Sequence, residues 1–90
     1  MNEIRDNLRA FGKAVKLYFD CKDKLAALSQ NWTLAEQGYK VAKTRADILT
    51  ISETLPGHYE PQRELLYDFA NELTRMNTSI ISGLFQEIRA

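Results

Sequence analysis

Apolar residues recur along the chain at the three- and four-residue spacing of α-helices, and no segment shows the strict alternation of a half-buried strand. Three stretches carry this pattern and predict helices over residues 2–29, 34–55 and 61–89. The first has a heptad-like, coiled-coil-like stripe formed by Ile4, Leu8, Phe11, Val15, Tyr18 and Leu25. The third has the clearest stripe, formed by Leu66, Phe69, Leu73, Met76, Ile80, Leu84 and Ile88 and broadened by Ala70, Ile81 and Phe85. That width suits contact with two neighbouring helices.

Local signals separate the three helices. Thr33 followed by Glu36 has the spacing of a capping box, which begins a helix. Extending the first stripe by sevens misses the second stripe by two positions, which favours a break at residues 30–33, with one bent helix as the alternative. The Pro-Gly pair at 56–57 ends the second helix, and Pro61 supplies the φ angle preferred at a first helical position.

Short connections make consecutive helices antiparallel, so the predicted fold is all-α, an elongated antiparallel three-helix bundle forming a single helical domain over residues 1–90. A chain of this length buries only about 60–65% of its unfolded surface. Several large apolar residues also lie beside or outside the stripes, namely Phe19, Tyr39, Ile51, Leu65 and Tyr67. This excess of apolar surface predicts a homodimer that completes the bundle.

The equal numbers of basic and acidic side chains narrow the classes of partner that the chain is expected to bind. Twelve basic side chains offset twelve acidic ones, which argues against a general binder of nucleic acid or membrane surfaces. No basic cluster precedes an apolar run at the start of the sequence, and nowhere do about 18 apolar residues run together. We therefore expect a cytoplasmic chain with no membrane partner, in which Cys21 is a free thiol.

Residues that could carry chemistry are few. The single histidine, His58, lies in the connection at 56–61 and is interpreted as a solvent-exposed turn residue, and Cys21 as a half-buried residue at the edge of the first stripe. The sequence contains no glycine-rich phosphate loop, nucleotide fingerprint or nucleophile elbow. The sequence thus predicts no catalytic, cofactor-binding or metal-binding residue, and we do not expect an enzyme.

Charged residues form two ridges on the predicted helices. The basic ridge consists of Arg5, Arg9, Lys13 and Lys16, and the acidic ridge of Glu60, Glu64, Asp68 and Glu72. The acidic ridge is interpreted as a solvated face, because acidic side chains are favoured near a helix N-terminus anyway. In an up-down-up bundle the two ridges lie toward the same end. Separated faces of opposite charge suit the orientation of one partner or of a second copy.

The connection at 56–61 is the first candidate for partner contact. Its two prolines stiffen the segment and lower the cost of ordering it on binding. Tyr59 and Tyr67 are predicted to be exposed aromatic anchors. The candidate partner-binding residues are therefore His58, Tyr59, Glu60 and Tyr67, together with Arg5, Arg9, Lys13 and Lys16.

The favoured function is a non-enzymatic protein-binding module that covers a surface on a larger protein partner. Such a module acts as an adaptor, a chaperone or an inhibitor, for example a phage- or plasmid-encoded antagonist of a host system, which is an analogy at the level of fold. One alternative is a nucleic-acid-associated regulator that uses the basic ridge. A second is a subunit of a structural homo-oligomer.

Overall fold

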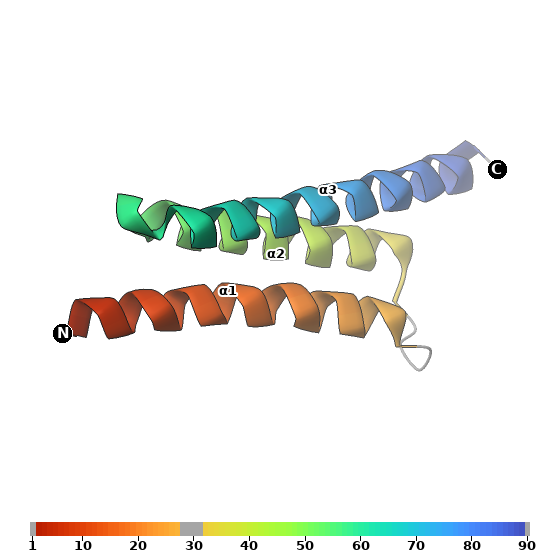
Figure 1. Ribbon diagram of the computed structural model, residues 1–90. Coiled ribbons are helices and arrows are strands. Elements are labelled where there is room, and N and C mark those ends of the chain that lie inside the picture. The colour runs from red at the N-terminus through yellow and green to blue at the C-terminus, as the bar shows by residue number, and fades with distance from the viewer. Residues whose placement is uncertain (1, 28–31, 90) are drawn as a thin grey trace.

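The chain forms three long helices, which the computed structural model describes over residues 2–27 and 32–89. Helix α1 spans Asn2–Ala26, α2 spans Leu34–Thr54 and α3 spans Glu60–Arg89, and a short 3-10 turn, η1 (Gly57–Tyr59), leads from α2 into α3. No strand occurs in these described ranges. Helices α1 and α3 run in the same direction and α2 runs against both (Figure 1). The predicted all-α antiparallel three-helix bundle is confirmed, and it is elongated, with extents of 56 × 24 × 14 Å.

The predicted boundaries at residues 2, 34 and 89 agree with the structure, and the other three differ from it by one to three residues. Helix α1 ends at Ala26, where the Ala27 amide donates to the carbonyl three residues before it at 3.4 Å, the tighter pattern that often closes a helix. Helix α2 ends at Thr54, and α3 begins at Glu60 because η1 leads directly into it. The favoured prediction of two separate helices is therefore confirmed, and the alternative of one bent helix is wrong. Half of the predicted break falls on residues 28–31, which lie outside the described residues.

The capping box at the start of α2 is confirmed. The Glu36 amide donates to Thr33 Oγ1 at 3.0 Å, and the Thr33 amide donates to Glu36 Oε1 at 3.2 Å. Each residue thus satisfies a backbone amide that the first helical turn leaves without a partner. This reciprocal pair fixes where α2 begins.

The most extensive helix contact joins α2 to α3. Val41 and Ile48 of α2 and Leu66 and Leu73 of α3 are fully buried in the core. Near the start of α2 the Leu34 side chain packs against Gly83 of α3, because a Cβ atom at Gly83 would lie 3.0 Å from Leu34 Cδ1. A glycine at this position lets α3 continue past the start of α2.

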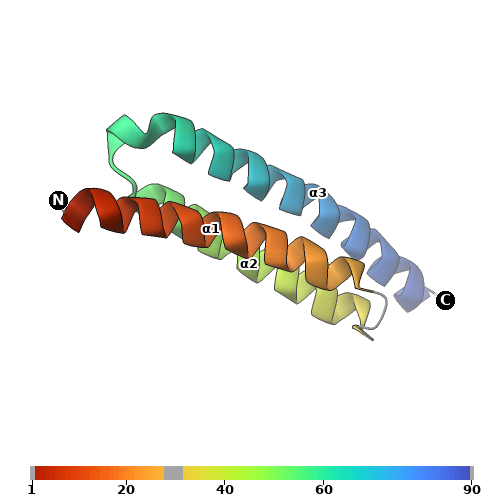
Figure 2. The ribbon, with the colours of Figure 1, turned by 60° about the horizontal axis from the view of Figure 1, so that its bottom comes forward.

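Helix α1 packs along α2 and meets α3 over a smaller area, although α1 and α3 lie side by side in both views (Figures 1 and 2). Ala14 and Cys21 are its fully buried residues. The interpretation of Cys21 as half-buried at the stripe edge is therefore wrong, because Cys21 follows Ala14 by seven residues and lies on the same buried side of the helix.

The start of the first predicted apolar stripe and the end of the third are more exposed than the stripe pattern predicts. Ile4 and Leu8 at the start of α1 are 56% and 52% exposed, and Phe85 and Ile88 near the end of α3 are 62% and 78% exposed. Helix α1 contacts α3 at few places, which leaves these two side chains of α1 about half exposed. The last turns of α3 extend beyond Leu34, the first residue of α2, so no neighbouring helix covers them.

Candidate protein-binding surfaces

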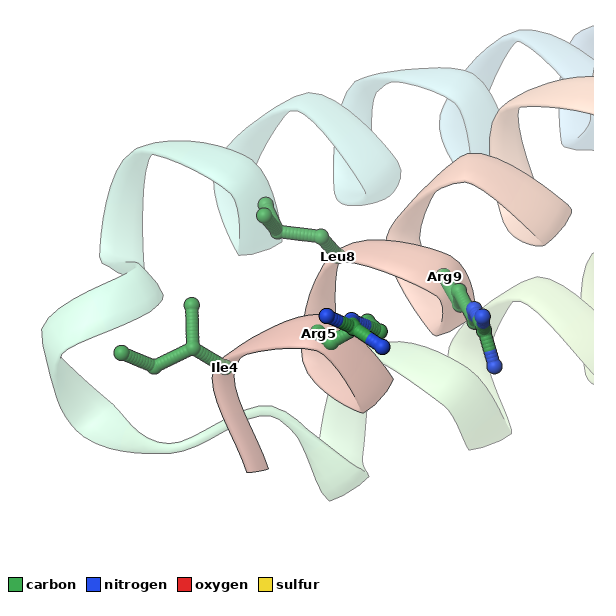
Figure 3. A pocket seen from close by; sticks show the side chains of 4 residues that line it. All are labelled: Ile4, Arg5, Leu8 and Arg9. Carbon is green, nitrogen blue, oxygen red and sulfur yellow. The ribbon is translucent and has the colours of Figure 1, made fainter. Parts of the chain in front are cut away.

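An exposed apolar surface lies between α1 and α3. It is formed by Ile4, Leu8 and Phe19 of α1 and Leu65 of α3, and we call these residues the α1–α3 face. Ile4 and Leu8 point toward η1 and the first turns of α3, whereas Arg5 and Arg9 point away from them (Figure 3). These four residues of α1 line an open hollow of about 470 Å³.

The charged ridges lie along the two sides of this face. All eight of their residues are exposed: Arg5, Arg9, Lys13 and Lys16 on α1, and Glu60, Glu64, Asp68 and Glu72 on α3. Because α1 and α3 are parallel, both ridges lie toward the end of the bundle where these helices begin. The exposure predicted for the ridges is therefore confirmed, whereas their role in binding stays a prediction.

Lys13 departs from the rest of the basic ridge. It lines a hollow between α1 and α2, together with Leu17 of α1 and Asp47, Thr50 and Ile51 of α2. At 100° per residue, the remaining basic residues fall on the side of α1 opposite the buried Ala14 and Cys21. The basic edge of the α1–α3 face therefore consists of Arg5, Arg9 and Lys16.

A polar cluster joins α1 to α3 at the middle of the bundle. The Tyr18 hydroxyl donates a hydrogen bond to Glu72 Oε2, and Lys22 Nζ lies 3.9 Å from the same oxygen. Burial raises the pKa of Tyr18, and the hydrogen bond to Glu72 raises it further. The hydrogen bond with Tyr18 in turn raises the pKa of Lys22. Glu72 therefore bridges two helices, whereas the sequence indicated a purely solvated residue.

A second apolar surface, not predicted from the sequence, lies on the first two turns of α2. Trp32, Ala35, Glu36, Tyr39 and Lys40 line a hollow of about 450 Å³, which we call the α2 hollow. Tyr39 is 69% exposed. The detectable signal was the seven-residue spacing of Trp32 and Tyr39 with Ala35 between them, on the side of α2 away from its buried stripe.

The connection between α2 and α3 only partly matches its prediction. His58 and Glu60 are exposed as expected, but Tyr59 is only 8% exposed, so the expectation that it is an exposed anchor is wrong. The Tyr59 amide donates to the Pro56 carbonyl at 3.0 Å, and this turn directs the ring into the core. Tyr67, 41% exposed on α3, has the predicted exposure.

Arg63, which sequence reasoning missed, holds this connection in place. Its Nε donates to the Ser52 carbonyl at 3.1 Å, and one terminal nitrogen donates to the carbonyls of Leu55 and Pro56, the latter at 3.3 Å. These carbonyls lie at the end of α2 and in the turn that follows it, and those of Ser52 and Pro56 also accept from the Leu55 and Tyr59 amides. Arg63 therefore ties the end of α2 to the start of α3.

Neither chemistry nor similarity singles out another site. Within residues 2–27 and 32–89, no group of three or more His, Cys, Asp and Glu side chains is placed to hold a metal ion. No helix among the described residues combines the length and apolar character that crossing a bilayer requires. Comparison with protein-family models, curated proteins and solved structures finds no match to the chain.

Proposed function

We propose that the protein is a non-enzymatic protein-binding module that covers a surface on a larger partner protein, as an adaptor, a chaperone or an inhibitor does. The observation that carries this proposal is the α2 hollow. Trp and Tyr dominate the binding energy of protein interfaces because their rings bury a large area with few rotatable bonds. In the α2 hollow Trp32 and Tyr39 flank Ala35, whose small side chain leaves room for an apolar group of the partner.

The rim of the α2 hollow supports a contact of defined orientation. Glu36 and Lys40 place one charge of each sign at its border. An apolar centre with a charged rim is the usual composition of a protein interface. A partner side chain of either sign can thus pair at the rim while an apolar group fills the centre.

The backbone beneath the hollow is already ordered. Gln37 Nε2 donates to the Trp32 carbonyl at 3.0 Å, and the capping box of Thr33 and Glu36 fixes the first turn of α2. Order in the free protein lowers the entropy lost on binding. We place the encounter in the cytoplasm, where the buried Cys21 stays reduced.

A site-specific cross-linking experiment tests this function. A photo-cross-linking amino acid replaces Ala35 in cells that naturally produce the protein, and mass spectrometry identifies the cross-linked protein. The dissociation constant is then measured with that purified partner. We expect Tyr39→Ala to weaken binding by roughly thirtyfold, the effect of losing a hot-spot residue.

Tyr67→Ala removes the same type of exposed side chain from α3, at the other predicted aromatic anchor. A dissociation constant that changes with Tyr39→Ala and not with Tyr67→Ala assigns the contact to the α2 hollow, and the reverse result assigns it to Tyr67. The proposed role of the α2 hollow is wrong if Tyr39→Ala and Ala35→Glu both bind the partner as the native chain does, with circular dichroism showing unchanged helicity.

A further inference from the structure

We propose that the α1–α3 face is the interface of a parallel homodimer, in which α1 of each copy lies over α3 of the other. This inference does not depend on the proposed function, because the α2 hollow lies on a different surface. The occupant of the face is a second copy of the chain, and the argument rests on the size of the face, its charges and its register.

The α1–α3 face has the size that a stable dimer needs. From Ile4 to Ala26, α1 is about 33 Å long at 1.5 Å per residue, and α3 lies beside its last ~24 Å, where the two helices together are about 20 Å wide. The resulting footprint of roughly 600 Å² per copy reaches the lower end of the ~600–1,000 Å² per partner that a specific interface buries. The four apolar residues that define the face supply its hydrophobic centre.

The two long edges of the face carry opposite charge. Arg5, Arg9 and Lys16 border it on α1. Glu64 and Asp68 border it on α3, on the side of that helix opposite the buried Leu66 and Leu73. A copy that presents its basic edge to the acidic edge of another therefore gains favourable pairing wherever the two edges are level.

The register of α1 on α3 places these charges at matching heights. The Tyr18 ring stacks on the Phe69 ring, and Lys22 lies 3.9 Å from Glu72, so a residue of α1 is level with the residue about 50 positions later in α3. On this register Arg9 is level with Glu60, and Lys16 is level with the turn that contains Asp68.

The charges select one of the two symmetric arrangements. A two-fold axis across the helices would place α1 over α1 and bring the two basic edges together. An axis along the helices places α1 over α3 at the same height and pairs each basic edge with an acidic one. This second arrangement places Lys16 of one copy opposite Asp68 of the second copy.

Gly12 leaves room for the second copy at the centre of the basic edge. Apart from its chain neighbours and the nearby backbone of α1, no atom lies within 4 Å of the position that its Cβ would occupy. A glycine inside a helix costs about 1 kcal/mol relative to alanine, and no contact within the single chain requires it here. In the dimer, the missing side chain of Gly12 would let a helix of the second copy approach α1 closely.

Sedimentation equilibrium tests the interface. We expect the native chain to be a dimer at tens of micromolar, and Leu8→Glu to make it a monomer, because a charge would be buried at the centre of the face. Leu8 is half exposed in the single chain, so helicity by circular dichroism should be unchanged. Phe85→Glu, beyond the end of α1, is the matched control and should remain a dimer.

A charge exchange tests the orientation. Lys16→Asp and Asp68→Lys should each weaken the dimer by roughly tenfold, and the double variant should recover most of that loss because the pair is restored with its signs reversed. A native chain that stays monomeric overturns the proposal and leaves the face to a different protein. A dimer insensitive to Leu8→Glu overturns the assigned face, and a double variant weaker than both single variants overturns the parallel arrangement. None of these three results would bear on the proposed role of the α2 hollow in binding a partner protein.

Discussion

The ring of Tyr18 in α1 stacks on the ring of Phe69 in α3, with centroids 4.0 Å apart and an angle of 8° between the planes. Phe19 packs edge-on against both rings, at 5.0 and 5.8 Å. Because α1 contacts α3 over a small area, these rings and the Tyr18 hydrogen bond to Glu72 set the position of α1 on α3. Substitutions that remove these rings should therefore lower the free energy of unfolding by a large amount.

We expect Tyr18→Ala to lower the free energy of unfolding by about 3 kcal/mol, because it removes a buried aromatic ring and its stacking partner loses contact. Tyr18→Phe keeps the ring and loses only the hydrogen bond, so it should cost about 1 kcal/mol. Urea unfolding at a fixed protein concentration measures both values. Equal losses for the two variants would show that the stack does not position α1.

Stability should fall at alkaline pH through the same residue. Burial raises the pKa of Tyr18 above its ordinary value of about 10, so the unfolded chain loses this proton first as the pH rises. The stability that the neutral phenol contributes is complete below pH ~10 and is lost as the pH rises through the raised pKa. The raised pKa of Lys22 acts in the same direction.

Urea unfolding at a series of pH values above neutrality measures this dependence. Tyr18→Phe serves as the control and should lose less stability than the native chain over the alkaline range. Parallel curves for the two proteins would contradict the role given to the Tyr18 proton.

Replacing Arg63 with alanine should lower the free energy of unfolding by about 2 kcal/mol. The substitution leaves the carbonyls of Ser52, Leu55 and Pro56 without the charged donor that now binds them. Arg63→Lys should recover little of the loss, because an ammonium group lacks the fixed fork of the guanidinium. Full recovery by lysine would show that charge alone stabilises the connection.

Two glycines should respond in opposite directions to a larger side chain. Gly12→Ala should raise the free energy of unfolding by about 0.5–1 kcal/mol at concentrations where the chain is monomeric, because its Cβ meets no atom and alanine favours the helix. Gly83→Val should lower it by about 1–3 kcal/mol, because the added atoms press on Leu34. Thermal unfolding followed by circular dichroism measures both, and a destabilising Gly12→Ala would contradict the open environment of that position.

Short-range features of the fold were predictable from the sequence. The apolar period predicted the three helices, and the spacing of Thr33 and Glu36 predicted the start of α2, because both signals lie within one or two helical turns. The exposed charged ridges follow from the same periodicity.

Features that depend on packing between distant segments were not predictable. The bond between Tyr18 and Glu72 joins residues 54 positions apart, and no local pattern relates them. Tyr59 lies in a turn whose sequence resembles an exposed loop, yet the turn points its ring into the core. The exposure of Ile4 and Leu8 depends on how far α3 stands from α1, which the apolar period of a single helix does not determine.

The parallel homodimer is tested most directly by intermolecular distances between spin labels. In a Cys21→Ala background, single cysteines replace the exposed Asp6, Lys13 and Lys24 of α1, one in each protein. Double electron–electron resonance then measures the distance between the two copies of each label. We predict three similar distances, because a two-fold axis along the helices keeps every residue of α1 at the same separation from its counterpart. Distances that differ steeply among the three labels, or the absence of any intermolecular distance, would contradict the parallel dimer.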